Sequence, residues 1–401
     1  MKLFYLIPYF LLLSCFTASA QCWKTIAAGP VHTIAIKNDG TIWGWGYNYY
    51  GQLGDGTDIP QNIPTQIGTA NNWKTVSTGM NHALAIKEDG TLWAWGSGLL
   101  GDGINYTKSL PIQIGTATNW KAVGAGRNFS LALKQDGSIW SCGINSLGQL
   151  GDGTNATKNS FTQIGNATNW QSISTGDEFS VAIKQDNTIW AWGNNYSGQI
   201  GDGTNANRNI PTQIGTANNW QTVVCGKSHV VATKLNGTLW AWGINGQAQL
   251  GNGTTNDTNA PIQVGFATHW SAVIAAGSLS SYAVTQNGFL WAWGGNGQGQ
   301  LGNGANTNQT TPVQIGNANN WQKIDAGEYH LVSVNVNNEL LIWGNNSYGQ
   351  LGNGTYISQN TPMQLGVCNN TLPVQILSFT GKSNNGFNLR IYGNYFIYRR
   401  Y

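Results

Sequence analysis

The sequence predicts an all-β protein, a seven-bladed β-propeller of four-stranded antiparallel blades. The first observation is a repeat, because a tryptophan returns about every fifty residues along the 401-residue chain. These positions are Trp23, Trp73, Trp120, Trp170, Trp220, Trp270 and Trp321. The second observation is that each repeat holds four short apolar segments separated by turn residues, which is the pattern of one propeller blade.

The first three strands of a repeat are expected at Trp73–Val76, His82–Ile86 and Leu92–Trp95 in the second copy. Gly79 separates the first two strands, and Asp89-Gly90 separates the second from the third. Such a dipeptide between apolar segments indicates a β-hairpin, because both central residues of a type I′ turn need positive φ. Related dipeptides recur as Asp39-Gly40, Asp136-Gly137, Asn236-Gly237 and Asn287-Gly288.

The fourth strand is expected to begin at a proline in six copies and at Phe161 in the remaining one. The prolines are Pro64, Pro111, Pro211, Pro261, Pro312 and Pro362. Proline has no N–H to donate to a central ladder, so this strand should form the outer edge of the blade. Trp43 and Trp45 are two residues apart in the third strand and should both point into the wedge between blades. The propeller is expected over residues 21–368.

Residues 1–20 have the pattern of a secretory signal peptide. Lys2 precedes the apolar run Leu3–Leu13, and Ala18-Ser19-Ala20 supplies small residues at the cleavage site. An alternative is a lipoprotein anchored at Cys15. No other segment approaches the ~20 apolar residues that a membrane span needs. We therefore expect a protein that is secreted or held at the cell surface, without a membrane span.

The composition excludes some classes of protein. Charged residues make up only 9% of the chain, whereas the chain contains 54 glycines and 19 tryptophans. A disordered chain would be rich in charge and poor in aromatic residues. The net charge of +3 is too small for the basic stripe of a nucleic-acid-binding protein, so no nucleic-acid partner is expected.

The repeat resembles the regulator-of-chromosome-condensation (RCC1) repeat over about Cys22 to Cys368. The motif is nearly complete in the first copy, as His32, then Asp39-Gly40-Thr41-Ile42-Trp43-Gly44-Trp45-Gly46, then Gly51-Gln52-Leu53-Gly54-Asp55-Gly56. The resemblance implies a seven-bladed propeller. Its founding member is a nuclear exchange factor for a small GTPase, but a secreted chain of low charge does not fit that role. A secreted bacterial propeller of this repeat type that inhibits a β-lactamase is a nearer analogue, and it binds a protein on one face.

The C-terminal extension, residues 369–401, carries a second resemblance. Leu372-Pro373-Val374-Gln375-Ile376-Leu377-Ser378-Phe379 is similar to the segment that precedes the sorting domain of proteins secreted by gliding bacteria. The chain stops soon afterwards, so the extension is interpreted as a truncated sorting-domain linker.

No catalytic, metal or cofactor site is predicted. One position of the repeat holds a histidine in four copies, His32, His82, His229 and His330. Equivalent positions on adjacent blades diverge, so these histidines are not expected to share a metal ion. Each is instead expected to form a hydrogen bond to a backbone carbonyl. Eight aspartates lie in two turn positions that become asparagine in later copies. Asparagine replaces aspartate readily in turns but not in catalysis or calcium binding. No nucleophile motif or phosphate-binding loop occurs in the sequence.

A binding surface is predicted at the end of the blades that carries the loops between the first and second strands and between the third and fourth strands. The hairpin end is nearly constant, whereas these loops vary and carry polar residues beside tyrosines, as recognition surfaces do. The candidate binding residues are Tyr47, Tyr49, Tyr50, Asn81, Arg127, Asp177, Glu178, Tyr196, Lys227, Glu328, Tyr329 and Tyr348.

The expected function is non-catalytic binding of an extracellular protein by a monomer. A glycan- or surface-binding adhesin is the alternative, and an enzyme or a nucleotide exchange factor is less favoured.

The cysteines are expected to have different roles. Cys22 and Cys368 lie at the two ends of the repeat array. They correspond to Asn72 and Ala70 of the connector between the first two blades, which are two residues apart. A disulfide between them would close the ring, since this separation is near disulfide reach. Cys142 replaces a tryptophan and Cys225 takes a small-residue position, so both are expected to be buried and unpaired.

Overall fold

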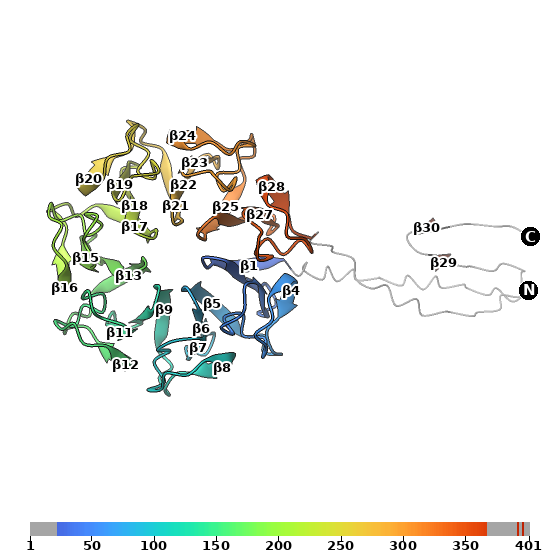
Figure 1. The fold of residues 1–401 in the computed structure, drawn as a ribbon, viewed down its shortest axis with the longest axis horizontal. Helices are drawn as coiled ribbons and strands as arrows, with labels where there is room; N and C mark the ends of the chain where they lie inside the picture. The colour runs from blue at the N-terminus through green and yellow to red at the C-terminus, as the bar shows by residue number, and fades with distance from the viewer. Residues whose placement is uncertain (1–21, 367–390, 393–394, 397–401) are drawn as a thin grey trace, which may run out of the picture. The chain divides into compact units, whose positions relative to one another are not determined.

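The computed structural model describes residues 22–366, 391–392 and 395–396. Residues 22–366 form seven four-stranded antiparallel sheets arranged around a central axis (Figure 1). In each sheet the strands follow one another in chain order, so every blade is one uninterrupted stretch of sequence. The seven-bladed, all-β propeller is therefore confirmed. The predicted signal peptide, the alternative anchor at Cys15 and the extension before residue 391 lie outside the described residues.

The innermost strands line the axis, and the outermost strands form the rim. The innermost strands are β1 (Trp23–Ala28), β5 (Trp73–Thr78), β9 (Trp120–Ala125), β13 (Trp170–Thr175), β17 (Trp220–Cys225), β21 (Trp270–Ala276) and β25 (Trp321–Ala326). The second strands are β2 (His32–Lys37), β6 (His82–Lys87), β10 (Phe129–Lys134), β14 (Phe179–Lys184), β18 (His229–Lys234), β22 (Ser280–Thr285) and β26 (His330–Asn335). The third strands are β3 (Ile42–Gly46), β7 (Leu92–Gly96), β11 (Ile139–Gly143), β15 (Ile189–Gly193), β19 (Leu239–Gly243), β23 (Leu290–Gly294) and β27 (Leu340–Gly344). The outermost strands are β4 (Gln61–Gln66), β8 (Lys108–Gln113), β12 (Lys158–Gln163), β16 (Arg208–Gln213), β20 (Thr258–Gln263), β24 (Gln309–Gln314) and β28 (Gln359–Gln364).

The prediction for the start of the outer strand was wrong by three residues. β4 begins at Gln61 and carries Pro64 in its interior. The register with β3 shifts between the pairs Gly44↔Thr65 and Gly46↔Gln61, so Pro64 lies in a bulge between them. A bulged edge strand needs no N–H at that position, and the strand can therefore begin before the proline.

The turn role of the aspartates is visible at the hairpins. Asp39 Oδ1 accepts hydrogen bonds from the N–H and the hydroxyl of Thr41, at 2.9 Å and 2.6 Å. The following Gly40 has φ +80°. Asn187 and Asn338 occupy the same position with φ +61° and +60°, a conformation that asparagine tolerates better than most residues.

Buried tryptophans join neighbouring blades. Trp95 is fully buried, and its indole N–H donates to the Gln52 carbonyl of the preceding blade at 2.9 Å. Trp45 donates in the same way to the Gln350 carbonyl at 2.8 Å, which joins the last blade to the first. The expectation that tryptophans fill the wedges between blades is confirmed.

The histidines also join blades, but the expected partner was wrong. His330 Nε2 lies 3.0 Å from Thr33 Oγ1, a hydroxyl of the next blade rather than a backbone carbonyl. His82 and His229 meet Ser130 and Ser281 in the same way, at 3.0 Å and 2.9 Å. The histidine ring is long enough to cross the wedge between blades, so it reaches a side chain there.

The propeller has two different faces. At one face, the loop between the first and second strands of a blade is hydrogen-bonded to the loop between its third and fourth strands, as in the bond from Ser97 N to Asn81 O. We call this the loop face. At the other, the hairpins pair with the inter-blade connectors, as in the bond from Glu88 N to Asn72 O. We call this the hairpin face.

The remaining described residues form β29 (Ile391–Tyr392) and β30 (Tyr395–Phe396), which pair antiparallel. No helix able to cross a membrane is present in the part of the chain that the structure describes.

Candidate functional site

Four of the predicted tyrosines meet on the loop face where the last blade adjoins the first. The ring centroid of Tyr47 lies 4.9 Å from that of Tyr49, 6.1 Å from Tyr50 and 5.1 Å from Tyr348. Tyr49 is 64% exposed, and Tyr50 and Tyr348 are each 44% exposed. Burial of Tyr47, with the neighbouring phenols Tyr50, Tyr348 and Tyr49, raises the pKa of its hydroxyl. We call these four residues the aromatic cluster.

The loop that carries Tyr47, Tyr49 and Tyr50 is fixed by hydrogen bonds of the Asn48 side chain. Asn48 lies between Tyr47 and Tyr49 in the sequence, and its side chain is fully buried. The amide of Asn48 donates to the carbonyls of Thr57 and Ile59, at 3.1 Å and 3.2 Å, while its Oδ1 accepts from Leu53 N at 2.9 Å. Because the buried amide fixes both ends of the loop, the exposed tyrosines stand on a rigid support.

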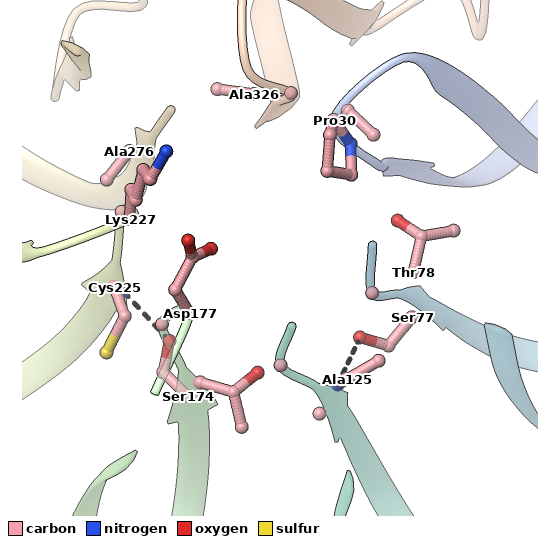
Figure 2. A pocket seen from close by; sticks show the side chains of 18 of the residues that line it. Pro30, Ser77, Thr78, Ala125, Ser174, Asp177, Cys225, Lys227, Ala276 and Ala326 are labelled. Atoms are coloured by element: carbon pink, nitrogen blue, oxygen red, sulfur yellow. Dashed lines mark hydrogen bonds between the residues drawn. The ribbon is translucent and has the colours of Figure 1, made fainter. Parts of the chain in front are cut away.

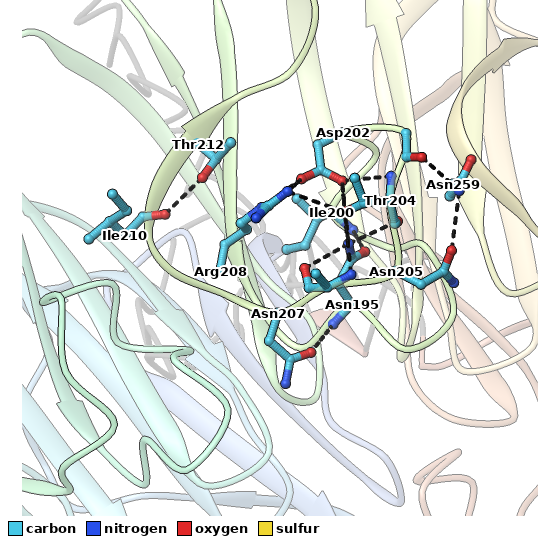
Figure 3. A network of polar contacts seen from close by, with 12 residues as sticks. Asn195, Ile200, Asp202, Thr204, Asn205, Asn207, Arg208, Ile210, Thr212 and Asn259 are labelled. Atoms are coloured by element: carbon cyan, nitrogen blue, oxygen red, sulfur yellow. Dashed lines mark hydrogen bonds and ion pairs between the residues drawn. The ribbon is translucent and has the colours of Figure 1, made fainter.

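The same loop support recurs in other blades. In the fourth blade, Asn195 donates to the carbonyls of Thr204 and Ala206, and Asp202 accepts from Arg208 Nε at 2.7 Å (Figure 3). Asn259 of the next blade donates to the Gly203 carbonyl at 3.0 Å. The loops are thus fixed within their blade and against the neighbouring blade.

A second feature of the loop face is a cavity on the propeller axis, which we call the axial cavity. It has a volume of about 320 Å³ and is lined by residues from all seven blades. Ser77, Ser174, Asp177 and Lys227 surround its open centre (Figure 2). Its size lies at the lower end of the range for small-ligand pockets.

Four of the predicted residues, from four of the seven blades, line the axial cavity with alternating charge. Arg127 Nη1 lies 4.0 Å from Asp177 Oδ2, and Lys227 Nζ lies 3.9 Å from Glu328 Oε1. The loop backbones are also linked, because Arg127 N donates to Asp177 O and Asp177 N donates to Lys227 O. Burial raises the pKa of the Asp177 carboxyl to about 6, against the opposing effects of Lys227 and Arg127.

Asp325 is a cavity residue that sequence reasoning missed. Its Oδ2 accepts from Ala28 N of the first blade at 2.8 Å, and its Oδ1 accepts from Ala326 N at 3.0 Å. Burial raises the pKa of its carboxyl to about 6, while these two backbone hydrogen bonds lower it. The sequence did contain a signal for Asp325, because the equivalent position of every other repeat holds a small or apolar residue.

The other predicted residues lie on the loop face but do not join one group. Tyr196 is 68% exposed and belongs to the fourth blade, away from the aromatic cluster. Glu178 accepts from Asn194 Nδ2 at 3.0 Å, which fixes it in its own blade. Asn81 and Tyr329 are half-buried, and their backbone carbonyls accept from Ser97 N and Asn345 N.

The described cysteines, at positions 22, 142 and 225, are all buried, and Cys142 and Cys225 are free thiols. The expectation for Cys142 and Cys225 is confirmed, and burial raises the pKa of both, to about 12 for Cys225. Cys368 lies outside the described residues, so its disulfide with Cys22 stays a prediction. Among the described residues, no three histidine, cysteine, aspartate or glutamate side chains are grouped as a metal site would require.

These features define a class of protein, a seven-bladed β-propeller whose face loops are fixed by buried side-chain amides. Comparison with known families places the chain more closely. Residues 13–273 match the RCC1-like domain, and residues 287–334 and 337–382 match the RCC1 repeat. The chain belongs to the RCC1-like propeller family.

The solved structures that resemble this chain share its fold. Human WBSCR16 superposes with a TM-score of 0.73 at 21% identity, covering 82% of this chain and 94% of that one. Prp20p from Saccharomyces cerevisiae gives a TM-score of 0.73 at 20% identity, covering 83% of this chain and 88% of that one. Its structure is reported together with its binding to Gsp1p and histones. The ultraviolet-B receptor UVR8 of Arabidopsis thaliana is 43% identical over 42 residues, which is 10% of each chain.

Proposed function

We propose that this chain is a secreted, non-catalytic binding protein that holds a protein partner on its loop face. The observation that carries this proposal is the aromatic cluster, in which Tyr47, Tyr49 and Tyr50 stand on a loop fixed by buried Asn48. Tyr348 joins them from the equivalent loop of the last blade, which buried Asn346 fixes in the same way. Tyrosines on a rigid support give a large contact area at a low entropic cost, and they are enriched at the centres of protein interfaces.

Charged residues elsewhere on the loop face suit the polar part of such an interface. Arg127, Asp177, Lys227 and Glu328 lie on the same face, where they line the axial cavity. Their charges alternate, so they favour a partner with a complementary pattern over one with a single strong charge. Fold likeness alone assigns no function, and the proposal therefore depends on this surface.

Site-specific photo-crosslinking tests the proposal. We would replace Tyr49 with the aromatic photo-crosslinker p-benzoylphenylalanine and irradiate the protein in culture medium. The matched control is the same replacement at Phe266, which is 98% exposed on the hairpin face. We expect a defined protein adduct from position 49 and none from position 266.

Affinity measurements on the captured partner complete the test. Tyr49→Ala should weaken binding by about 1–2 kcal/mol, as truncation of an interface anchor does, whereas Phe266→Ala should leave it unchanged. Tyr196→Ala reports whether the footprint extends to the fourth blade. Carbohydrate adducts at position 49 would favour a glycan-binding adhesin instead. Equal crosslinking at both positions would mean that the loop face is not the binding surface.

A further inference from the structure

The axial cavity contains a carboxylate that has no opposing charge. Asp325 lines the cavity, and among the described residues that line it, the cations are Arg127 and Lys227. Both already face carboxylates, at 4.0 Å from Asp177 and 3.9 Å from Glu328. An ionised carboxylate in a partly enclosed site is costly unless it is paired, so a cation entering the cavity would be favoured there.

Comparison between blades shows that the charge of Asp325 exceeds what the fold requires. Ser77 occupies the equivalent position in the second blade, and its Oγ accepts from Ala125 N of the next blade at 3.0 Å. Ser174 does the same for Cys225 N at 2.9 Å. Asp325 accepts the corresponding bond from Ala28 N, a role that an uncharged serine already fills at two other junctions.

The remaining lining residues suit a ligand with a small cationic head and an aliphatic chain. The hydroxyl oxygens of Ser77 and Ser174 lie near the axis, and each accepts one backbone N–H from the next blade (Figure 2), which leaves a second lone pair for a further donor. Val123, Ile173 and Val224 supply apolar surface to the same cavity. Each carboxylate oxygen of Asp325 accepts one backbone N–H, and each has a second lone pair for a further donor.

We propose that the axial cavity binds a primary ammonium group on a short aliphatic chain, with Asp325 as its counter-ion. An ammonium group has three donors, of which the carboxylate of Asp325 can accept one or two, while the others remain for water or another acceptor that lines the cavity. The ligand is either a free alkylamine or the side chain of a lysine presented by a protein partner. This site is separate from the aromatic cluster, so the proposal does not depend on the proposed partner.

Calorimetric titration at pH 7.5 tests the proposal with three probes. Butylamine represents a free amine, acetyl-Gly-Lys-Gly-amide represents a presented lysine, and the same peptide with norleucine in place of lysine is the uncharged control. We expect millimolar or tighter binding of at least one amine probe and no binding of the norleucine peptide. Preference for butylamine identifies a small-molecule site, whereas preference for the lysine peptide identifies a partner's side chain.

Asp325→Ser is the decisive variant, because serine already accepts the same inter-blade hydrogen bond at two other junctions. Amine affinity should fall at least about tenfold, as expected for loss of a charge-assisted pair. Asp325→Asn is a second uncharged variant should the first unfold, and Tyr49→Ala should leave amine binding unchanged. The proposal is overturned if wild-type protein binds neither amine, if Asp325→Ser binds them equally well, or if calcium alone binds in an Asp325-dependent manner.

Discussion

At the scale of single residues, the histidine contacts determine where the imidazole proton lies. The hydroxyl of Thr33 donates its one hydrogen to the Gln350 carbonyl at 3.0 Å. It therefore accepts from His330, whose Nε2 must carry the proton. Ser281 donates to the Gln249 carbonyl at 2.7 Å, so the same tautomer follows for His229. This hydroxyl acts as a relay between an imidazole and the carbonyl of another blade.

His32 lacks this contact, which gives a test at one residue. The position that should hold its hydroxyl partner is Ala83, and neither ring nitrogen of His32 has a partner among the described side chains. Ala83→Ser should supply a hydroxyl that accepts from His32 and donates to the Gln52 carbonyl. We expect a gain of about 1 kcal/mol in the free energy of unfolding, measured by urea denaturation.

A double-mutant cycle provides the control. His32→Phe places at this position the residue that Phe129 and Phe179 show to fit there. Ala83→Ser should then give no gain in the His32→Phe background. An equal gain in both backgrounds would show that the stabilisation does not come from the histidine contact.

Sequence reasoning was least successful for residues whose role depends on a neighbour in another blade. It located the histidines in one repeat position but not their hydroxyl partners, which occupy the following repeat. It likewise selected Tyr47 and Tyr348, yet their contact follows only from the closure of the ring, since about three hundred residues separate them. Asp325 was missed because its partner, Ala28, lies across the same junction.

At the scale of secondary-structure elements, the positions of the hairpins were predicted well, but the type I′ turn was wrong. Gly40 has positive φ whereas Asp39 does not, and the loop between β2 and β3 spans the four residues 38–41, with a hydrogen bond from Gly40 N to Lys37 O. The Asp-Gly and Asn-Gly dipeptides identified hairpins that the structure contains. Strand ends were predicted less well, since the bulge around Pro64 depends on how the edge strand meets its partner. A hairpin glycine satisfies two requirements, positive φ and close approach to the neighbouring connector.

Two glycines of the third blade allow the two requirements to be tested separately, because one meets both and the other meets only the first. Gly137 has φ +81°, and a Cβ there would lie 2.1 Å from the Thr168 carbonyl oxygen. Gly165 has φ +56°, but a Cβ added there would meet no other atom within 4 Å. Gly165→Ala should cost about 1 kcal/mol from backbone conformation alone, whereas Gly137→Ala should cost about 3 kcal/mol or more. Urea midpoints of the two variants compare them directly, and equal losses would show that the close approach is relieved without cost.

At the scale of the whole molecule, the buried titratable groups predict a loss of stability in acid. Burial lowers the pKa of His32, His229 and His330 to about 3 and of His82 to about 4. Unfolded histidines protonate near pH 6.5, so between pH 6 and 4 the unfolded chain binds about four protons that the folded chain does not. Acid therefore favours unfolding through these four groups.

Two carboxyls oppose this effect. Burial raises the pKa of Asp177 and Asp325 to about 6, so the folded chain binds two protons there that the unfolded chain does not. From these six groups alone, the net difference of about two protons should reduce the free energy of unfolding by about 3 kcal/mol for each pH unit between 6 and 4. Aspartates whose pKa is lowered in the folded chain, such as Asp202, add to this loss near pH 4. His32→Phe removes one of the four histidines and should lower this slope by about 1.4 kcal/mol per pH unit. Urea denaturation at several pH values measures both slopes, and unchanged slopes would mean that His32 titrates normally in the folded protein.

The uninterrupted blades have a consequence for how such a chain can arise and be rearranged. Because all four strands of a blade come from one stretch of sequence, a gene segment that encodes one repeat encodes a complete structural module. Tandem duplication in frame therefore adds whole blades without leaving an unpaired strand. For the same reason, circular permutation at any inter-blade connector preserves every sheet, and only the place at which the ring lacks a peptide link moves from one wedge to another.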